Sequence, residues 1–275
     1  FAFCPAPTKT KPDTHRMMWL PGDWTDDTDQ LVLILQSLLN ARGAADERGF
    51  AQRLLAWREN GFSELGDESA AGLGAHTKAV LQDPDFANRP TDVARAHWSA
   101  KQGEAAANGA VMRTAITGVP RYFDRDAVLA TTAVICRVTH PDPRCVASCA
   151  AAAVCVSELL RGEEADARAV VDTAVEAAVA VLHEEAVAVA SSVWADGAAA
   201  AAEAELRACA TASSLRELAL DEPRAIGYTY KCLGAGLWAL RCDEGFASAM
   251  RAITAEAGDA DTNGALGGAL LGCRL

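Results

Sequence analysis

The chain has 275 residues and a formal net charge of −12 at pH 7. This length is sufficient to bury one large hydrophobic core, and we expect a single domain. The excess of acid excludes a protein whose binding to nucleic acid or to an anionic membrane rests on overall positive charge.

Residues 1–21 are rich in Pro, Thr and Lys and are predicted to be irregular, so the domain is expected over 22–275. Beyond them, runs dominated by Ala, Leu, Glu and Arg, with few alternating β-branched stretches, predict an all-α fold. The first helix is expected to begin at the N-cap residue Thr25 and to stop at Gly43. Further helices are expected over 48–60, 76–82, 91–107, 126–138, 143–161, 164–190, 197–220, 230–240 and 244–256, before a last helix after Thr262.

The cysteines indicate the compartment. There are nine, none forms a C-x-x-C pair, and most lie in runs of Ala, Val and Leu. This pattern predicts buried thiols in a reducing environment. No stretch combines a basic segment, an apolar core and a cleavage site, and charged residues interrupt the apolar runs before they reach bilayer length. We therefore expect a cytoplasmic or nuclear protein without a membrane span.

Two acidic strings lie near the two ends of the domain, Thr25-Asp26-Asp27-Thr28 and Asp259-Ala260-Asp261-Thr262. Neighbouring carboxylates repel one another unless a positive group stands between them. Oxygen donors without a nearby His or Cys favour a hard divalent cation such as Mg²⁺ over zinc. The strings therefore predict two halves of one metal site.

The helix after the second string contains several glycines, and each costs a helix interior about 1 kcal/mol relative to alanine. They are Gly264, Gly267, Gly268 and Gly272. Small residues spaced by three and four positions let a neighbouring backbone come close. We expect this helix to be pressed against the helix that starts at Thr25, which would bring the two acidic N-termini together.

Five segments together resemble the ADP-ribosylglycohydrolase family. Its two acidic motifs match Gly22-Asp23-Trp24-Thr25-Asp26-Asp27-Thr28 and Gly258-Asp259-Ala260-Asp261-Thr262-Asn263-Gly264-Ala265. Asn108-Gly109-Ala110-Val111-Met112-Arg113 is similar to the family's N-G-x-x-M-R segment beside the bound ADP-ribose, and Thr139-His140 resembles its T-H pair near the ligand. Gly72-Leu73-Gly74 resembles the phosphate-side loop of the serine-linkage enzymes.

The resemblance implies a compact orthogonal helical bundle with two Mg²⁺ ions, or Mn²⁺ in their place. It also implies a hydrolase that cleaves the bond between ADP-ribose and a modified protein side chain, acting as a monomer. The implied metal ligands are Thr25, Asp26, Asp27, Asp259, Asp261 and Thr262, with Asp26, Asp27 and Asp261 catalytic. The implied substrate contacts are Gly72, Gly74, Asn108, Gly109, Met112 and His140. Tyr228 either borders the adenine or packs in the core, and Arg113 either touches the ligand or orders its loop.

One departure from the family pattern bears on turnover. Family members carry an earlier G-D-A-x-G string followed by a glutamate, and residues 1–21 contain no glutamate. That element either precedes Phe1 or is absent from this branch. Its absence motivates a second hypothesis, a weakly active or inactive relative that binds ADP-ribose or has a structural role, as the lens crystallins of this family do. A third is hydrolysis of another nucleotide glycoside, such as an ADP-ribosylated nucleic-acid end, which the acidic net charge disfavours.

Overall fold

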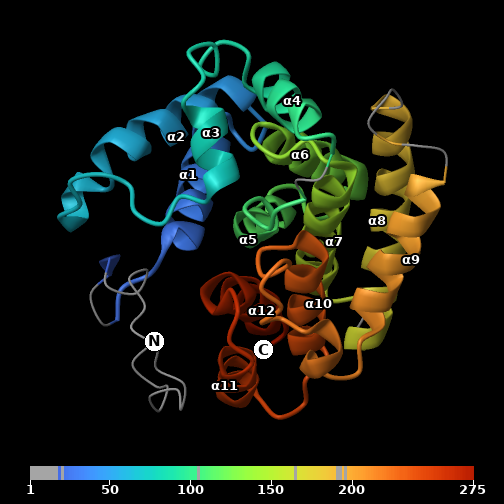
Figure 1. Ribbon diagram of the computed structural model, residues 1–275. Coiled ribbons are helices and arrows are strands. Elements are labelled where there is room, and N and C mark those ends of the chain that lie inside the picture. The colour runs from blue at the N-terminus through green and yellow to red at the C-terminus, as the bar shows by residue number, and fades with distance from the viewer. Residues whose placement is uncertain (1–17, 20–21, 104–105, 164–165, 190–193, 195–196) are drawn as a thin grey trace.

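The predicted all-α fold is confirmed by the computed structural model, which describes residues 18–19, 22–103, 106–163, 166–189, 194 and 197–275. Within these ranges the chain forms helices and no strand (Figure 1). The irregular segment expected over 1–21 lies outside the described residues apart from 18 and 19. The α-helices are α1 (Asp26–Asn40), α2 (Glu47–Asn60), α3 (Ala75–Leu81), α4 (Pro90–Ala100), α5 (Val111–Thr114), α6 (Arg125–Arg137), α7 (Pro143–Arg161), α8 (Ala167–Ala188), α9 (Ala198–Thr211), α10 (Thr229–Leu240), α11 (Phe246–Ala255) and α12 (Ala260–Arg274). Short 3-10 helices are η2 (Ser63–Leu65), η3 (Ala115–Gly118) and η4 (Leu215–Leu218).

Several helices begin where the sequence supplies a capping carboxylate. Asp46, Asp124, Asp142 and Asp166 each accept a hydrogen bond from a backbone N–H in the first turn of α2, α6, α7 and α8. Such a side chain satisfies one of the N–H groups that a helix start leaves without an intrahelical partner. The helix starts read from the sequence therefore lie within a few residues of the observed ones.

Two predicted helices are shorter in the structure. The helix expected over 91–107 ends at Ala100, because Gln102 and Gly103 both have positive φ angles, 53° and 74°, which a right-handed helix does not allow. The helix expected over 197–220 ends at Thr211. There the hydroxyls of Ser213 and Ser214 donate to the Glu217 carboxylate, and a separate turn, η4, begins at Leu215.

Helix α7 is the centre of the largest core cluster. It lies against α6, α8, α10 and α12, and Figure 1 shows it between α1 to α3 on one side and the outer pair α8 and α9 on the other. Every residue from Cys145 to Glu158 is buried. By length and composition α7 could cross a bilayer, but most of it is enclosed by other helices, as in the core of a folded domain.

The thiols follow the same core. The eight described cysteines are all free, and five of them, on α6, α7 and α10, are buried. Burial raises the pKa of the Cys136 and Cys145 thiols well above their ordinary value. These thiols are therefore protonated and unreactive at neutral pH, and the prediction of buried cysteines is confirmed for these five.

The glycine-rich helix α12 packs differently from the prediction. Its main neighbours are α10 and α11 rather than α1. A Cβ at Gly267 would stand 2.7 Å from Ile253 Cδ1 of α11, and a Cβ at Gly236 of α10 would stand 2.7 Å from Leu266 Cγ of α12. The glycines thus permit the close contact with α10 and α11, while residues at the start of α12 line the same cavity as Asp26 and Asp27 at the start of α1.

Candidate active site

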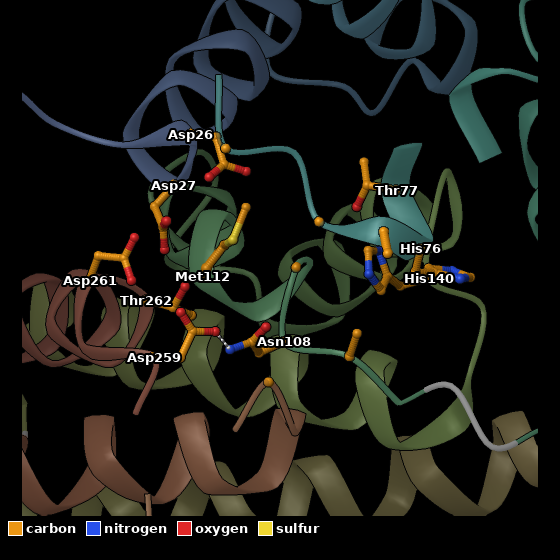
Figure 2. A pocket seen from close by; sticks show the side chains of 16 residues that line it. Asp26, Asp27, His76, Thr77, Asn108, Met112, His140, Asp259, Asp261 and Thr262 are labelled. Atoms are coloured by element: carbon orange, nitrogen blue, oxygen red, sulfur yellow. Dashed lines mark hydrogen bonds between the residues drawn. The ribbon is translucent and has the colours of Figure 1, made fainter. Parts of the chain in front are cut away.

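A cavity of about 360 Å³ lies where the N-terminal ends of α1 and α12 meet the loops before α3 and α5. Figure 2 shows the aspartates of α1 and α12 at one end of this cavity and two histidines at the other, with Met112 and Asn108 between them. No lysine or arginine lines it among the described residues. The lining consists of Asp26, Asp27, Gly72, Gly74, Ala75, His76, Thr77, Ala107, Asn108, Gly109, Met112, His140, Gly227, Asp259, Asp261 and Thr262.

Most residues proposed from the sequence line this cavity, and two do not. Thr25 stands behind Asp27 and donates its hydroxyl to Asp27 Oδ2 at 2.9 Å. Tyr228 is turned away: its hydroxyl donates to Glu205 Oε2 at 2.8 Å, and its ring packs edge-on against Tyr230. Tyr228 therefore packs against the core, as its second alternative has it, and does not line this cavity.

The carboxylates of the acidic end are buried, and no described lysine or arginine lines the cavity beside them. Asp26 and Asp27 are 7% and 3% exposed. Burial, followed by repulsion from Asp27, raises the pKa of Asp26 to about 9, while burial and repulsion from Asp261 raise that of Asp27 to about 7. Burial also raises the pKa of Asp259 to about 6. Each of these groups is therefore harder to ionise than a free carboxyl, and positive charge brought to it would favour its ionised form.

Two contacts set the orientation of Asp26. Its Oδ2 accepts a hydrogen bond from Gln30 Nε2 at 2.7 Å, one helical turn further along α1. Its Oδ1 lies against Gly72, where a Cβ would stand 2.7 Å from that oxygen and 2.7 Å from the Trp19 ring. Gly72 also has a φ of +83°, so both the space and the backbone require glycine here.

The neighbouring Asp29 belongs to the same turn but not to the cavity. It accepts hydrogen bonds from the indole N–H groups of Trp24 at 2.8 Å and Trp57 at 3.1 Å. Acidic character alone therefore does not identify the site residues of α1, because the helical position decides which carboxylate faces the cavity.

Asn108 connects the middle of the chain to the second acidic string. Its Nδ2 donates to Asp259 Oδ2 at 2.7 Å, and its backbone N–H donates to the Gly227 carbonyl at 2.9 Å. Thr229 in turn donates its N–H to the Ala106 carbonyl. Residues 106–108 and 227–229 thus run side by side and hold Asn108 at the edge of the acidic end.

The other end of the cavity contains His140 and also His76, which sequence reasoning missed. His76 Nε2 contacts the Thr139 carbonyl oxygen at 2.9 Å, and His140 Nδ1 contacts Thr139 Oγ1 at 2.7 Å. The ring centroids are 4.8 Å apart. Burial lowers the pKa of both rings, so they are neutral near pH 7. Gly109 packs on His140, since a Cβ there would stand 3.1 Å from His140 Nε2.

The acidic end has the donors that a hard divalent cation requires. Four carboxylates and the buried Thr262 supply oxygen, and Asp27 Oδ1 is buried without a hydrogen-bond partner in the described part of the chain. Among the described residues, no three carboxylate, imidazole or thiol groups are arranged as a set that could hold a metal ion by themselves. Hard cations that keep water in their shell do not need one. The donor set therefore fits such a cation, completed by hydroxyls and water.

The acidic cavity lies between helices from the two ends of an all-helical domain, so segments far apart in the sequence share one site. The sequence matches the family model described as ADP-ribosylglycohydrolase over residues 4–275. The chain therefore belongs to the ADP-ribosylglycohydrolase family.

Individual relatives agree with this assignment. The chain is 24% identical over 257 residues to the ADP-ribosylarginine hydrolase Tri1 of Serratia proteamaculans, covering 92% of this chain and 60% of the relative. It is 27% identical over 137 residues to an uncharacterized protein of Archaeoglobus fulgidus, covering 50% of this chain and 39% of the relative. A solved structure described as an ADP-ribosylglycohydrolase-related protein complex aligns with a TM-score of 0.58 and 25% identity, covering 98% of this chain and 79% of that one. This chain thus spans less than two thirds of either curated relative.

Proposed function

We propose that the protein is a hydrolase that releases ADP-ribose from a modified protein side chain and uses Mg²⁺, or Mn²⁺ in its place, at the acidic end of the cavity. The observation that carries the proposal is the meeting of Asp26, Asp27, Asp259 and Asp261 in one cavity that no described lysine or arginine enters. Family membership supports ADP-ribosylated compounds as the substrate class.

The residues proposed to hold the cation are those of the two strings, Thr25, Asp26, Asp27, Asp259, Asp261 and Thr262. Thr25 acts through its hydrogen bond to Asp27. When bound, a divalent cation supplies Lewis acidity toward a ribose oxygen and lowers the pKa of water. Its positive charge also removes the penalty that burial and mutual repulsion impose on the ionised aspartates.

The aspartates themselves can assist bond cleavage. Departure of the acceptor from a glycoside leaves positive charge on the anomeric carbon, in a state that resembles an oxocarbenium ion. Ionised carboxylates fixed near this carbon stabilise that charge more than they stabilise the neutral substrate. No glutamate lines the cavity among the described residues, so Asp26, Asp27 and Asp261 are assigned this role.

The preferred acceptor is proposed to be arginine. The Serratia relative aligned over 92% of this chain is named as an ADP-ribosylarginine hydrolase. The Gly72-Leu73-Gly74 loop is similar to that of serine-linkage enzymes and favours the other choice, but it covers a much smaller part of the chain. Arginine-linked and serine-linked substrates are therefore compared directly in the test.

The experiment measures release of ADP-ribose from arginine-linked, serine-linked and phosphate-linked substrates, with Mg²⁺ and with EDTA. The parent is compared with Asp26→Asn and Asp261→Asn. We expect Mg²⁺-dependent release, fastest from arginine, and a loss of about 100-fold or more in each variant, on the scale of removing one electrostatic contact to the transition state.

A matched control is Asp29→Asn, because Asp29 shares the first turn of α1 but faces Trp24 and Trp57 rather than the cavity. This variant is expected to retain Mg²⁺ binding and turnover. If the parent binds ADP-ribose with Mg²⁺ but cleaves no linkage, the protein is a binding or structural relative instead. If Asp26→Asn binds Mg²⁺ as tightly as the parent, the assignment of the metal site is wrong.

A further inference from the structure

A continuous chain of hydrogen bonds joins Asp26 at the acidic end of the cavity to His140 at the other end, through residues that do not line the cavity. Gln30 donates to Asp26 Oδ2 and accepts a hydrogen bond on its Oε1 from Arg113 Nη1. Arg113 Nη2 donates to Thr139 Oγ1 at 2.6 Å, and the same hydroxyl contacts His140 Nδ1 at 2.7 Å. Arg113 does not line the cavity. It is the one residue of this chain of hydrogen bonds that contacts both the α1 side and the His140 side.

The burial of this arginine is unusual. Arg113 is completely buried, as are Gln30 and Thr139. It forms no ion pair with a carboxylate among the described residues, and its guanidinium lies over the Phe50 ring at 5.1 Å. Burial lowers its pKa only to about 10, so it remains charged at neutral pH. A buried charge with neutral partners is costly, which argues for a role beyond filling space.

The guanidinium geometry explains why arginine is needed. Nη1 and Nη2 are held in one rigid plane, so their two hydrogen bonds fix the side chain of Gln30 relative to that of Thr139. Gln30 belongs to α1 and Thr139 to the turn before α7, more than 100 residues later in the chain. One planar group therefore aligns two distant segments that each carry a cavity residue.

The same bonds determine which nitrogen of His140 carries its proton. Arg113 has only donors, so Thr139 Oγ1 accepts from it. The described residues offer the hydroxyl proton of Thr139 no acceptor other than His140 Nδ1. Nδ1 is thus the acceptor, and the proton of the neutral ring lies on Nε2. His140 Nε2 is buried without a partner, next to Gly109 of the cavity lining.

We propose that Arg113 is a positioning residue that fixes Asp26 through Gln30 and holds His140 in its Nε2–H tautomer through Thr139. The buried guanidinium of Arg113, which does not line the cavity, then fixes the position of Asp26 at one end relative to that of His140 at the other. The effect on metal binding rests on the proposed function, whereas the effect on His140 does not.

The first test removes the link to Asp26. Gln30→Met has nearly the same volume as the parent residue but no donor for Asp26 and no acceptor for Arg113. The control is Gln36→Met on the same helix, since Gln36 accepts from Arg53 Nη1 far from the cavity. Titration calorimetry with Mg²⁺ alone is expected to show a loss of about 10-fold or more for Gln30→Met, the usual scale for residues behind metal ligands. Equal Mg²⁺ affinity in a folded Gln30→Met protein overturns this half of the proposal.

The second test needs neither metal nor substrate. Nitrogen NMR shifts of the His140 ring report its tautomer, and the parent is expected to show Nε2–H alone. Thr139→Val removes the hydroxyl and is expected to give a mixture of tautomers, while Thr139→Ser is expected to restore the parent spectrum. Thr132→Val, in a separate buried threonine pair, is the control. An unchanged His140 spectrum in Thr139→Val overturns this half.

The two readouts separate this proposal from the proposed function. A parent protein that binds no Mg²⁺ contradicts the metal-dependent function, yet the His140 spectrum still tests the role of Thr139 and Arg113. Arg113→Lys completes the set, because lysine keeps the charge but not the planar fork. It is expected to show the tautomer mixture of Thr139→Val, and a parent-like spectrum would show that charge alone is sufficient and that the fork is not required.

Discussion

The acidic end of the cavity, with Asp26, Asp27 and Asp259, and its histidine end, with His76 and His140, are both buried, but only the acidic end needs a counter-charge. Burial raises the pKa of Asp26, Asp27 and Asp259 and lowers that of His76 and His140, so every group is driven toward its neutral form. The aspartates also repel one another, and only added positive charge relieves that repulsion. The neutral histidines need no counter-charge. One cavity thus combines an end that depends on a cation with an end that does not.

Among the changes that compare the two ends, the largest expected effect comes from filling the space beside Asp26. Gly72→Ala places a methyl group 2.7 Å from Asp26 Oδ1 and imposes strain at a φ of +83°. We expect Mg²⁺ affinity to fall by about 10- to 100-fold, as when the support of a metal ligand is disturbed, measured by calorimetry. Gly66→Ala controls for backbone strain, since its φ is +98° but nothing lies within 4 Å. A similar loss in both variants would attribute the effect to strain.

A smaller effect is expected from the corresponding change at the histidine end. Gly109→Ala puts a methyl group 3.1 Å from the His140 ring and 3.4 Å from Thr77 Oγ1. We expect ADP-ribose to bind about 10-fold more weakly, the scale of one misplaced methyl group in a binding pocket, with Mg²⁺ affinity unchanged. Gly272→Ala, which makes only an ordinary contact with Phe246, is the control. Loss of Mg²⁺ binding in Gly109→Ala would show that the two ends are not separable.

The acidic end should also make stability depend on pH. The pKa values of Asp26, Asp27 and Asp259 in the folded state, about 9, 7 and 6, lie above their ordinary value of 3.8. Between about pH 4 and pH 9 the folded state therefore binds more protons than the unfolded state, and its stability falls as pH rises. We expect the Tm in EDTA to decrease from pH 5 to pH 9. The increase in Tm on adding Mg²⁺ is expected to be larger at pH 8 than at pH 5.

The Asp27→Asn variant checks the source of that pH dependence. It removes one of the titrating groups, so the decrease in Tm with pH in EDTA should be shallower than in the parent. A slope identical to that of the parent would show that the acidic end does not control the stability profile.

The smallest effect is expected at Tyr228, which belongs to neither end. Tyr228→Leu removes the hydrogen bond to Glu205 and the contact with Tyr230. We expect a loss of about 1 kcal/mol in stability, with ADP-ribose affinity within about twofold of the parent, a difference of less than about 0.5 kcal/mol. Tyr228→Phe retains the ring and isolates the hydroxyl. A large loss of ADP-ribose affinity in Tyr228→Leu would return this residue to the ligand site.

Site residues could be predicted from the sequence where they lie in short motifs. The acidic strings, Asn108 and His140 were found because each lies in a short segment with a recognisable pattern. His76 was missed because its position depends on a hydrogen bond to the carbonyl of Thr139, 63 residues away in the chain. At Tyr228 the sequence left two alternatives open: its neighbour Gly227 lines the cavity, whereas its own hydroxyl bonds to Glu205.

For the fold, too, local features were predicted and tertiary contacts were not. Helical composition gave the all-α class and most helix positions, because propensity and capping act over a few residues. It did not give the partner of α12, since small residues such as Gly267 permit close approach without specifying the neighbour. Arg113 is an intermediate case: the pattern identified it, but only the tertiary contacts with Gln30 and Thr139 distinguish between its two proposed roles.

The separation of the two acidic strings along the chain affects when the site forms during synthesis. Asp27 and Asp259 are 232 residues apart (259 minus 27). At about 5–20 residues per second, a ribosome needs roughly 12–46 s to make the second string after the first. During that time α1 and the helices around α7 can begin to fold, but the carboxylates of α1 have no counterpart. A nascent chain therefore has no complete cavity until Thr262 has left the ribosome.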